Sequence, residues 1–65
     1  MDQFAIYVVR YPTEKATRYS RWYNLRATAE ILGEDLKEKI AGQDTDVGRI
    51  EVRNSKGNVV WEMEV

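Results

Sequence analysis

Residues 25–41 read LRATAEILGEDLKEKIA, and their apolar side chains recur at the spacing of one helix face. The apolar positions, separated by steps of four, three, four and four, are Leu25, Ala29, Leu32, Leu36 and Ile40. At about 100° per residue they fall within a stripe roughly 80° wide. Asn24 is a favoured N-cap residue, and Gly42 stands where a glycine commonly ends a helix. The pattern therefore predicts an amphipathic helix over residues 25–41.

One residue at the flank of this stripe is unusual for a helix interior. Gly33 costs roughly 1 kcal/mol relative to alanine at such a position. A close approach of the helix to the sheet would compensate, because glycine has no side chain to obstruct it.

A hairpin is predicted on each side of the helix. Residues 4–11 and 16–23 are rich in β-branched and aromatic side chains, and Pro12 ends the first of them. Residues 49–53 and 58–65 alternate in polarity around a turn that contains Gly57. We therefore expect one α+β domain over residues 1–65, β-β-α-β-β, with a four-stranded, mostly antiparallel sheet and one amphipathic helix packed on one face. The most apolar strands should be central, which predicts the strand order 2-1-4-3.

Composition excludes several classes of site. The 65 residues include no cysteine and no histidine, so a structural zinc site and a Ser-His-Asp triad are both ruled out. Acid–base chemistry by other side chains needs a pocket, and a single helix on a single sheet offers little depth. We therefore expect no enzymatic activity, no metal and no cofactor. The N-terminal residues lack the pattern of a signal peptide or a membrane span, so we expect a cytoplasmic protein without a membrane partner.

The sheet face that points away from the helix is the first candidate interaction surface. Its basic and aromatic residues are Tyr7, Tyr11, Arg18, Arg21, Trp22 and Tyr23. Aromatic rings stack on bases and arginines contact phosphates, so this composition would suit single-stranded nucleic acid. The same face is expected to carry Glu51, Glu62 and Glu64. Packing of the aromatic rings beneath arginine side chains is the favoured structural interpretation.

The exposed back of the helix is the second candidate. Glu30, Glu34 and Glu38 lie at successive i, i+4 positions opposite the apolar stripe, with Ile31 beside them. Most such faces are simply solvated. The functional alternative is a dock for a basic surface of a partner.

The sequence favours a small non-enzymatic protein-interaction module that binds a protein partner or self-associates through the outer sheet face or a strand edge. A small inhibitor or accessory protein of the type that phages encode belongs to this class. The alternative is a nucleic-acid-binding module that uses the basic and aromatic sheet face. The strand–helix outline by itself does not identify a function.

Overall fold

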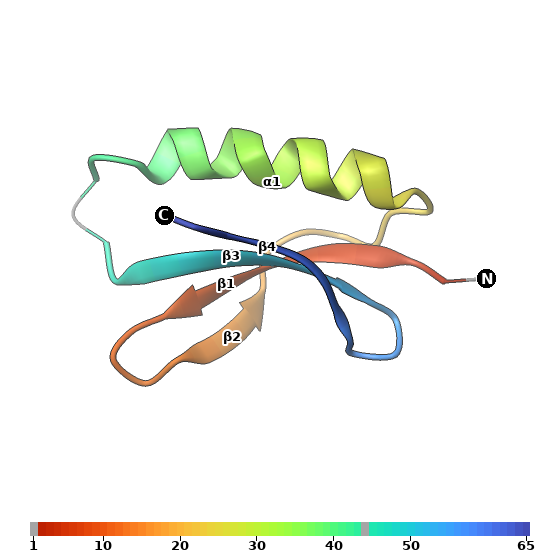
Figure 1. The fold of residues 1–65 in the computed structure, drawn as a ribbon, viewed down its shortest axis with the longest axis horizontal. Coiled ribbons are helices and arrows are strands. Elements are labelled where there is room, and N and C mark those ends of the chain that lie inside the picture. The colour runs from red at the N-terminus through yellow and green to blue at the C-terminus, as the bar shows by residue number, and fades with distance from the viewer. Residues whose placement is uncertain (1, 44) are drawn as a thin grey trace.

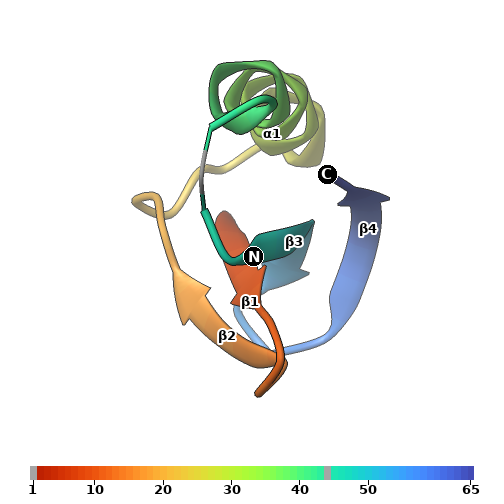
Figure 2. The ribbon, with the colours of Figure 1, turned by 90° about the vertical axis from the view of Figure 1, so that its left-hand side faces the viewer.

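The computed structural model describes residues 2–43 and 45–65, and it has the predicted α+β architecture (Figure 1). The elements in chain order are β1 (Phe4–Arg10), β2 (Lys15–Arg18), α1 (Arg26–Ile40), β3 (Val47–Asn54) and β4 (Val59–Glu64). The helix covers one face of the sheet, with β2 and β4 at the two sides (Figure 2). No helix in these residues is long and apolar enough to cross a membrane.

The sheet is antiparallel throughout, and its order is β2-β1-β3-β4, so the predicted order 2-1-4-3 is wrong. The strand at the centre beside β1 is β3, although it carries three charged residues. These charges pair with one another, as described below, and this pairing lets β3 be buried. The side chains of Glu62 and Glu64 in β4 are exposed, which suits an edge strand.

The core lies between the helix and the two central strands. Alternate residues of β1 and β3 point toward α1, which supplies Ala29 and Leu36. The buried strand residues of this cluster are Ile6, Val8, Val47, Ile50 and Val52. Trp61 and Val60 of β4 pack against the same cluster, because a bulge opposite Arg53 places an extra residue in β4. The helix is therefore anchored over β1 and β3, with its flanks over the two edges.

The helix sits rotated from the orientation that its apolar stripe predicts. A Cβ atom at Gly33 would lie 3.0 Å from Cζ3 of Trp61, so the ring occupies the space that glycine leaves. Gly33 is accordingly buried, whereas Leu32 is 37% exposed and Leu25 is 66% exposed. The prediction that Leu25 and Leu32 face the core is therefore wrong, because the stripe is centred nearer to Gly33. The close approach expected at Gly33 is confirmed.

Both ends of α1 can be compared with the prediction. The N-cap is Leu25, without a side-chain capping bond, and not Asn24. The side chain of Asn24 instead accepts a hydrogen bond from Gln3 Nε2 at 3.3 Å. At the other end Gly42 has a φ of 82°, the left-handed conformation that glycine adopts without strain after a helix.

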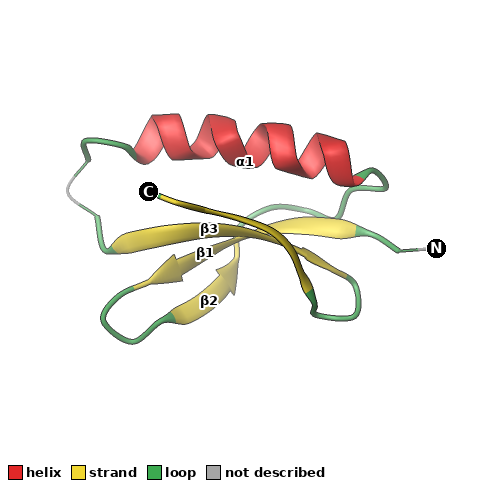
Figure 3. Ribbon diagram, viewed as in Figure 1, coloured by secondary structure: helices red, strands yellow, loops and turns green. Residues whose placement is uncertain are grey.

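The second strand is half as long as predicted, ending at Arg18 instead of residue 23 (Figure 3). The regular pairing of β1 with β2 ends here because the Ser20 hydroxyl accepts a hydrogen bond from the N–H of Ile6. The N–H groups of Tyr19 and Ser20 both donate to the Ile6 carbonyl. Pairing resumes at one bridge, where Phe4 and Tyr23 exchange hydrogen bonds of 2.7 and 2.6 Å. Residues 19–22 form the loop between these two pairings, and the chain then continues to α1.

The packing in the centre of the sheet leads to a stability prediction. Ile50→Ala removes a fully buried side chain and should lower the free energy of unfolding by about 2–5 kcal/mol. Ile31→Ala, on the exposed back of the helix, should change it by less than about 0.5 kcal/mol. Urea unfolding at low micromolar protein concentration measures both. Equal losses for the two variants would contradict this assignment of the core.

Candidate interaction site

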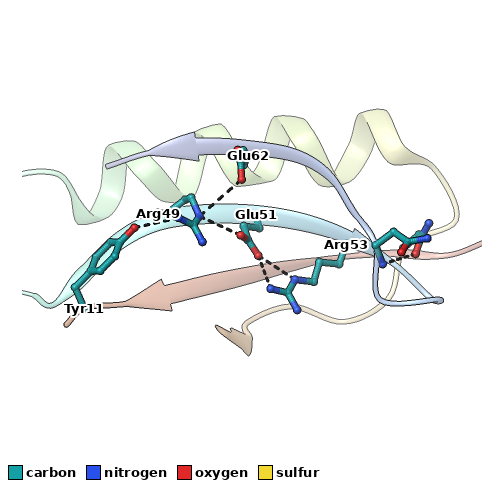
Figure 4. A network of polar contacts seen from close by, with 7 residues as sticks. Tyr11, Arg49, Glu51, Arg53 and Glu62 are labelled. Carbon is teal, nitrogen blue, oxygen red and sulfur yellow. Dashed lines mark hydrogen bonds and ion pairs between the residues drawn. The ribbon is translucent and has the colours of Figure 1, made fainter. Parts of the chain in front are cut away.

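The face of the sheet away from the helix is crossed by a network of charged side chains along β3 (Figure 4). The carboxylate of Glu51 is only 3% exposed and lies between two guanidinium groups. It accepts hydrogen bonds from Arg49 Nε at 3.0 Å and from Arg53 Nε at 2.9 Å. Arg53 also makes an ion pair of 2.7 Å through its Nη2 atom. All three residues lie on one face because alternate residues of a strand share a side.

Arg49 links this network to the residue that follows β1 and to the edge strand β4. Its Nη1 atom donates to the Tyr11 hydroxyl at 3.0 Å, and its Nε atom lies 3.8 Å from Glu62. The hydrogen bond to Glu51 raises the pKa of Arg49 above its ordinary value, so the charged form is favoured. The Tyr11 ring lies over Gly48, where a Cβ atom would collide with the ring atoms Cδ2 and Cε2. Tyr11 is thus held by its own chain on two sides.

The outer face is closed by its own long side chains. Ala5 and Val9 of β1 point to this face, yet neither retains exposed surface. Their cross-strand neighbours are Arg53 and Arg49, whose stems can cover small side chains. The guanidinium of Arg53 also lies 5.0 Å from the centre of the Tyr7 ring. Two predicted interaction residues, Tyr7 and Tyr11, are therefore already in contact with arginines of the same chain.

The segment from Arg18 to Tyr23, hereafter the 18–23 segment, is different. Arg18 lies 5.5 Å from the centre of the Trp22 ring, and Arg21 lies 5.1 Å from that of Tyr23. Within residues 2–43 and 45–65, neither guanidinium has a carboxylate at ion-pair distance. The other arginines of the chain, at positions 10, 26, 49 and 53, all have one. Aromatic rings therefore hold Arg18 and Arg21 in position. No acidic side chain among the described residues uses the N–H donors of these two guanidinium groups.

This segment also forms one wall of an open cleft against the helix. The cleft has a volume of about 130 Å³. It is lined by Ile6, Tyr19, Ser20, Tyr23, Leu32, Asp35, Leu36 and Lys39. Its floor is apolar, and two of its lining side chains are open to solvent: Tyr19 is 60% exposed and Leu32 is 37% exposed. The cleft exists because the rotation of α1 toward Trp61 lifts Leu32 away from the sheet.

Polar groups border the cleft on its helix side. Lys39 Nζ lies 3.0 Å from Asp35 Oδ2, one helical turn away. This hydrogen bond raises the pKa of Lys39, so the ammonium form is favoured. In the part of the chain that the structure describes, no group of three acidic, histidine or cysteine side chains is arranged to hold a metal ion.

The back of the helix carries the second predicted surface, hereafter the acidic ridge of Ile31, Glu34 and Glu38. Glu30, which was predicted to belong with them, makes an ion pair with Arg26 instead. Glu34 and Glu38 have no cationic partner at ion-pair distance among the described residues. Ile31 is 66% exposed, although it is a large apolar residue. The ridge thus combines an exposed apolar side chain with two uncompensated carboxylates.

The predicted residues are only partly brought together. Arg18 and Trp22 stay on the outer face near Tyr7, whereas Tyr23 pairs with Phe4 and packs against the core on the helix side. No sequence pattern indicates the cleft, because its lining comes from a broken strand and from a rotated helix. The sequence predicts Tyr19 in a strand and Leu32 in a helix, and each of these elements is expected to bury one face. A serine within an aromatic run, as at Ser20, was the one local signal of a break.

Comparison with known proteins finds no match to any family model, to any curated protein or to any solved structure.

The Glu51 network leads to a second stability prediction. Glu51→Ala leaves two arginines in the sheet without their shared carboxylate, and it should lower the free energy of unfolding by about 1–3 kcal/mol. Glu62→Ala is the matched control on the same face. It should change stability by less than about 0.5 kcal/mol, because that carboxylate is exposed and lies farther from Arg49. Thermal and urea unfolding of the two variants test this, and a neutral Glu51→Ala substitution would contradict the proposed role of the network.

Proposed function

We propose that this protein is a small non-enzymatic protein-interaction module that binds its partner through the 18–23 segment and the adjoining cleft. One observation carries the proposal. Two arginines without acidic partners in the described chain, Arg18 and Arg21, are held on aromatic rings in the 18–23 segment, whose residues Tyr19, Ser20 and Tyr23 line an open cleft. Guanidinium groups that are fixed in position lose little entropy when they bind a carboxylate. Arginine and aromatic residues are also the types that dominate binding energy at protein interfaces.

The surface suggests the chemistry of the partner. Two guanidinium groups favour carboxylates, with which arginine forms strong paired hydrogen bonds. The cleft, at about 130 Å³, is close in size to a cavity of about 150 Å³ that holds one benzene molecule. It therefore suits a single apolar side chain. We infer that the partner presents a short segment with one apolar residue near two acidic residues.

The same features argue for binding over catalysis. Pockets for small-molecule substrates commonly measure about 300–1,000 Å³, well above this cleft. A nucleophilic lysine needs a lowered pKa, whereas the pKa of Lys39 is raised by Asp35. A small inhibitor or accessory protein would act through a compact surface of this kind. Binding through the outer sheet face at Tyr7 and Tyr11 stays an alternative prediction, but these two rings already contact arginines of the same chain.

A peptide-display library screened against the wild-type protein tests the proposal. Selected peptides should be enriched in an apolar residue flanked by Asp or Glu. Their affinity should fall at least about tenfold for Arg18→Glu/Arg21→Glu. It should change little for Lys15→Glu/Lys56→Glu, which alters the net charge equally at lysines outside the site. Selected peptides that bind both variants equally well, or that shift no NMR signal of Tyr19 or Leu32, would contradict the assignment.

Nucleic-acid binding is a second candidate, supported by the same unpaired arginines on aromatic rings. It predicts saturable binding of a single-stranded oligonucleotide, followed by tryptophan emission at about 50 mM salt. This binding should weaken steeply at about 200 mM salt and disappear in Arg18→Glu/Arg21→Glu. The net charge of −1 and the carboxylates of the outer face weigh against it. Absence of binding at low salt would remove this candidate and leave the protein-binding proposal in place.

A further inference from the structure

We propose that the open edge of β4 is a second interaction surface, which takes an extended strand of a partner protein with alternating basic and apolar residues. β2 and β4 are the two edge strands, and Figure 2 shows β4 outermost on its side of the sheet. The surface is therefore separate from the 18–23 segment, which continues from β2, and the inference does not depend on the proposed function.

The backbone of β4 has hydrogen-bonding groups that face this edge. The N–H of Val65 donates to the Gly48 carbonyl at 3.0 Å, so these two residues form a bonded pair. Bonded and non-bonded pairs alternate along antiparallel strands, so the pairs that Glu62 and Glu64 make with β3 are non-bonded. The N–H and C=O groups of Glu62 and Glu64 therefore point away from β3, where the described chain has no further strand.

The two sides of β4 carry different side chains. Glu62 and Glu64 are exposed on the outer face, beside the charged residues of β3. Trp61 and Met63 lie opposite core residues of β3, on the helix side, and both keep part of their surface exposed. Val65 follows on that side and is 42% exposed. A strand added to β4 therefore meets carboxylates on one face and an apolar row on the other.

Charge determines what that strand carries. The outer faces of β3 and β4 hold three carboxylates, at Glu51, Glu62 and Glu64, and two guanidinium groups, at Arg49 and Arg53, which leaves one negative charge. Arg49 lies 3.8 Å from Glu62 but is bonded to Glu51. Opposite charges on directly facing residues stabilise a pair of strands. Basic residues therefore belong opposite Glu62 and Glu64, and alternation gives a partner strand that reads apolar-basic-apolar-basic-apolar.

A second copy of this chain fits the edge poorly. In an antiparallel pair of β4 strands centred on residues 62–64, glutamate faces glutamate, which destabilises a sheet. The β2 edge of a second copy offers only one cation to the outer face, Arg18, because Ala16 occupies the other position on that face. The complementary occupant is therefore a basic strand of another protein, which adds to the sheet through main-chain hydrogen bonds.

A preorganised peptide tests the inference. The probe is a cyclised β-hairpin whose free strand carries two lysines between three valines, with the lysine N–H groups pointing outward. A rigid strand loses little entropy on binding. At about 50 mM salt it should bind wild-type protein and shift the NMR amide signals of Glu62 and Glu64. These two amides should exchange rapidly with solvent in the free protein and be protected in the complex.

Matched controls test the charge pattern. A hairpin with glutamates in place of the lysines should bind wild-type protein at least about tenfold more weakly. Glu62→Lys/Glu64→Lys should reverse this preference. Glu34→Lys/Glu38→Lys has the same net charge and should keep the wild-type preference, because its substitutions lie on the exposed back of the helix. Circular dichroism and urea unfolding verify that both variants are folded.

N-methylation of the two lysine amides separates strand addition from charge attraction and leaves the protein unchanged. It removes the donors that face the carbonyls of Glu62 and Glu64 and keeps the charge, so affinity should fall at least about tenfold. Equal binding of the methylated or the glutamate hairpin would overturn the inference. No binding of the lysine hairpin at about 2 mM, or amide shifts at Tyr19 and Leu32 instead of β4, would also overturn it. These results are separate from the affinity of acidic peptides for the 18–23 segment, which tests the proposed function.

Discussion

The carboxylate of Glu51, held between Arg49 and Arg53, is the interaction on which the sheet depends. A strand with three charged residues can be central only if those charges satisfy one another, because an unpaired buried charge is costly. The two arginines approach Glu51 at 2.7–3.0 Å and also cover the small residues of β1. The network therefore determines that β3 lies beside β1 and that the outer face is closed by side chains of the chain itself.

The same network separates the arginines that bind Glu51 from those that do not. Arg49 and Arg53 are engaged with Glu51, whereas Arg18 and Arg21 lie near aromatic rings and have no acidic partner among the described residues. The rotation of α1 determines the surface beside the 18–23 segment. Trp61 takes the place left open at Gly33, so Leu32 moves to the edge of a cleft instead of filling the core. Packing on the β4 side of the helix thus creates an open site on the β2 side.

Local sequence patterns predicted the helix and the strands, and non-local contacts determined the strand order and the cleft. The helix over 25–41 and the turn at Gly57 follow from spacing and from backbone preference, which a single sequence contains. The strand order depended on the pairing of Glu51 with two arginines, which alternation cannot reveal. The cleft depended on the Trp61 ring and on the Ser20 hydroxyl, whose partners are distant in the sequence. That Arg18 and Glu34 have no ion-pair partner among the described residues became recognisable only after the other ion pairs were known.

Arg49 and Arg53 are bound to Glu51, whereas Arg18 and Arg21 have no acidic partner among the described residues. NMR of the arginine side-chain Nε–H groups distinguishes these two pairs of arginines. We expect slow exchange with solvent for Arg49 and Arg53, whose Nε–H groups donate to Glu51, and fast exchange for Arg18 and Arg21. Glu51→Gln should accelerate exchange at Arg49 and Arg53 alone. Similar exchange at all four arginines, or no response to Glu51→Gln, would show that Glu51 does not hold Arg49 and Arg53.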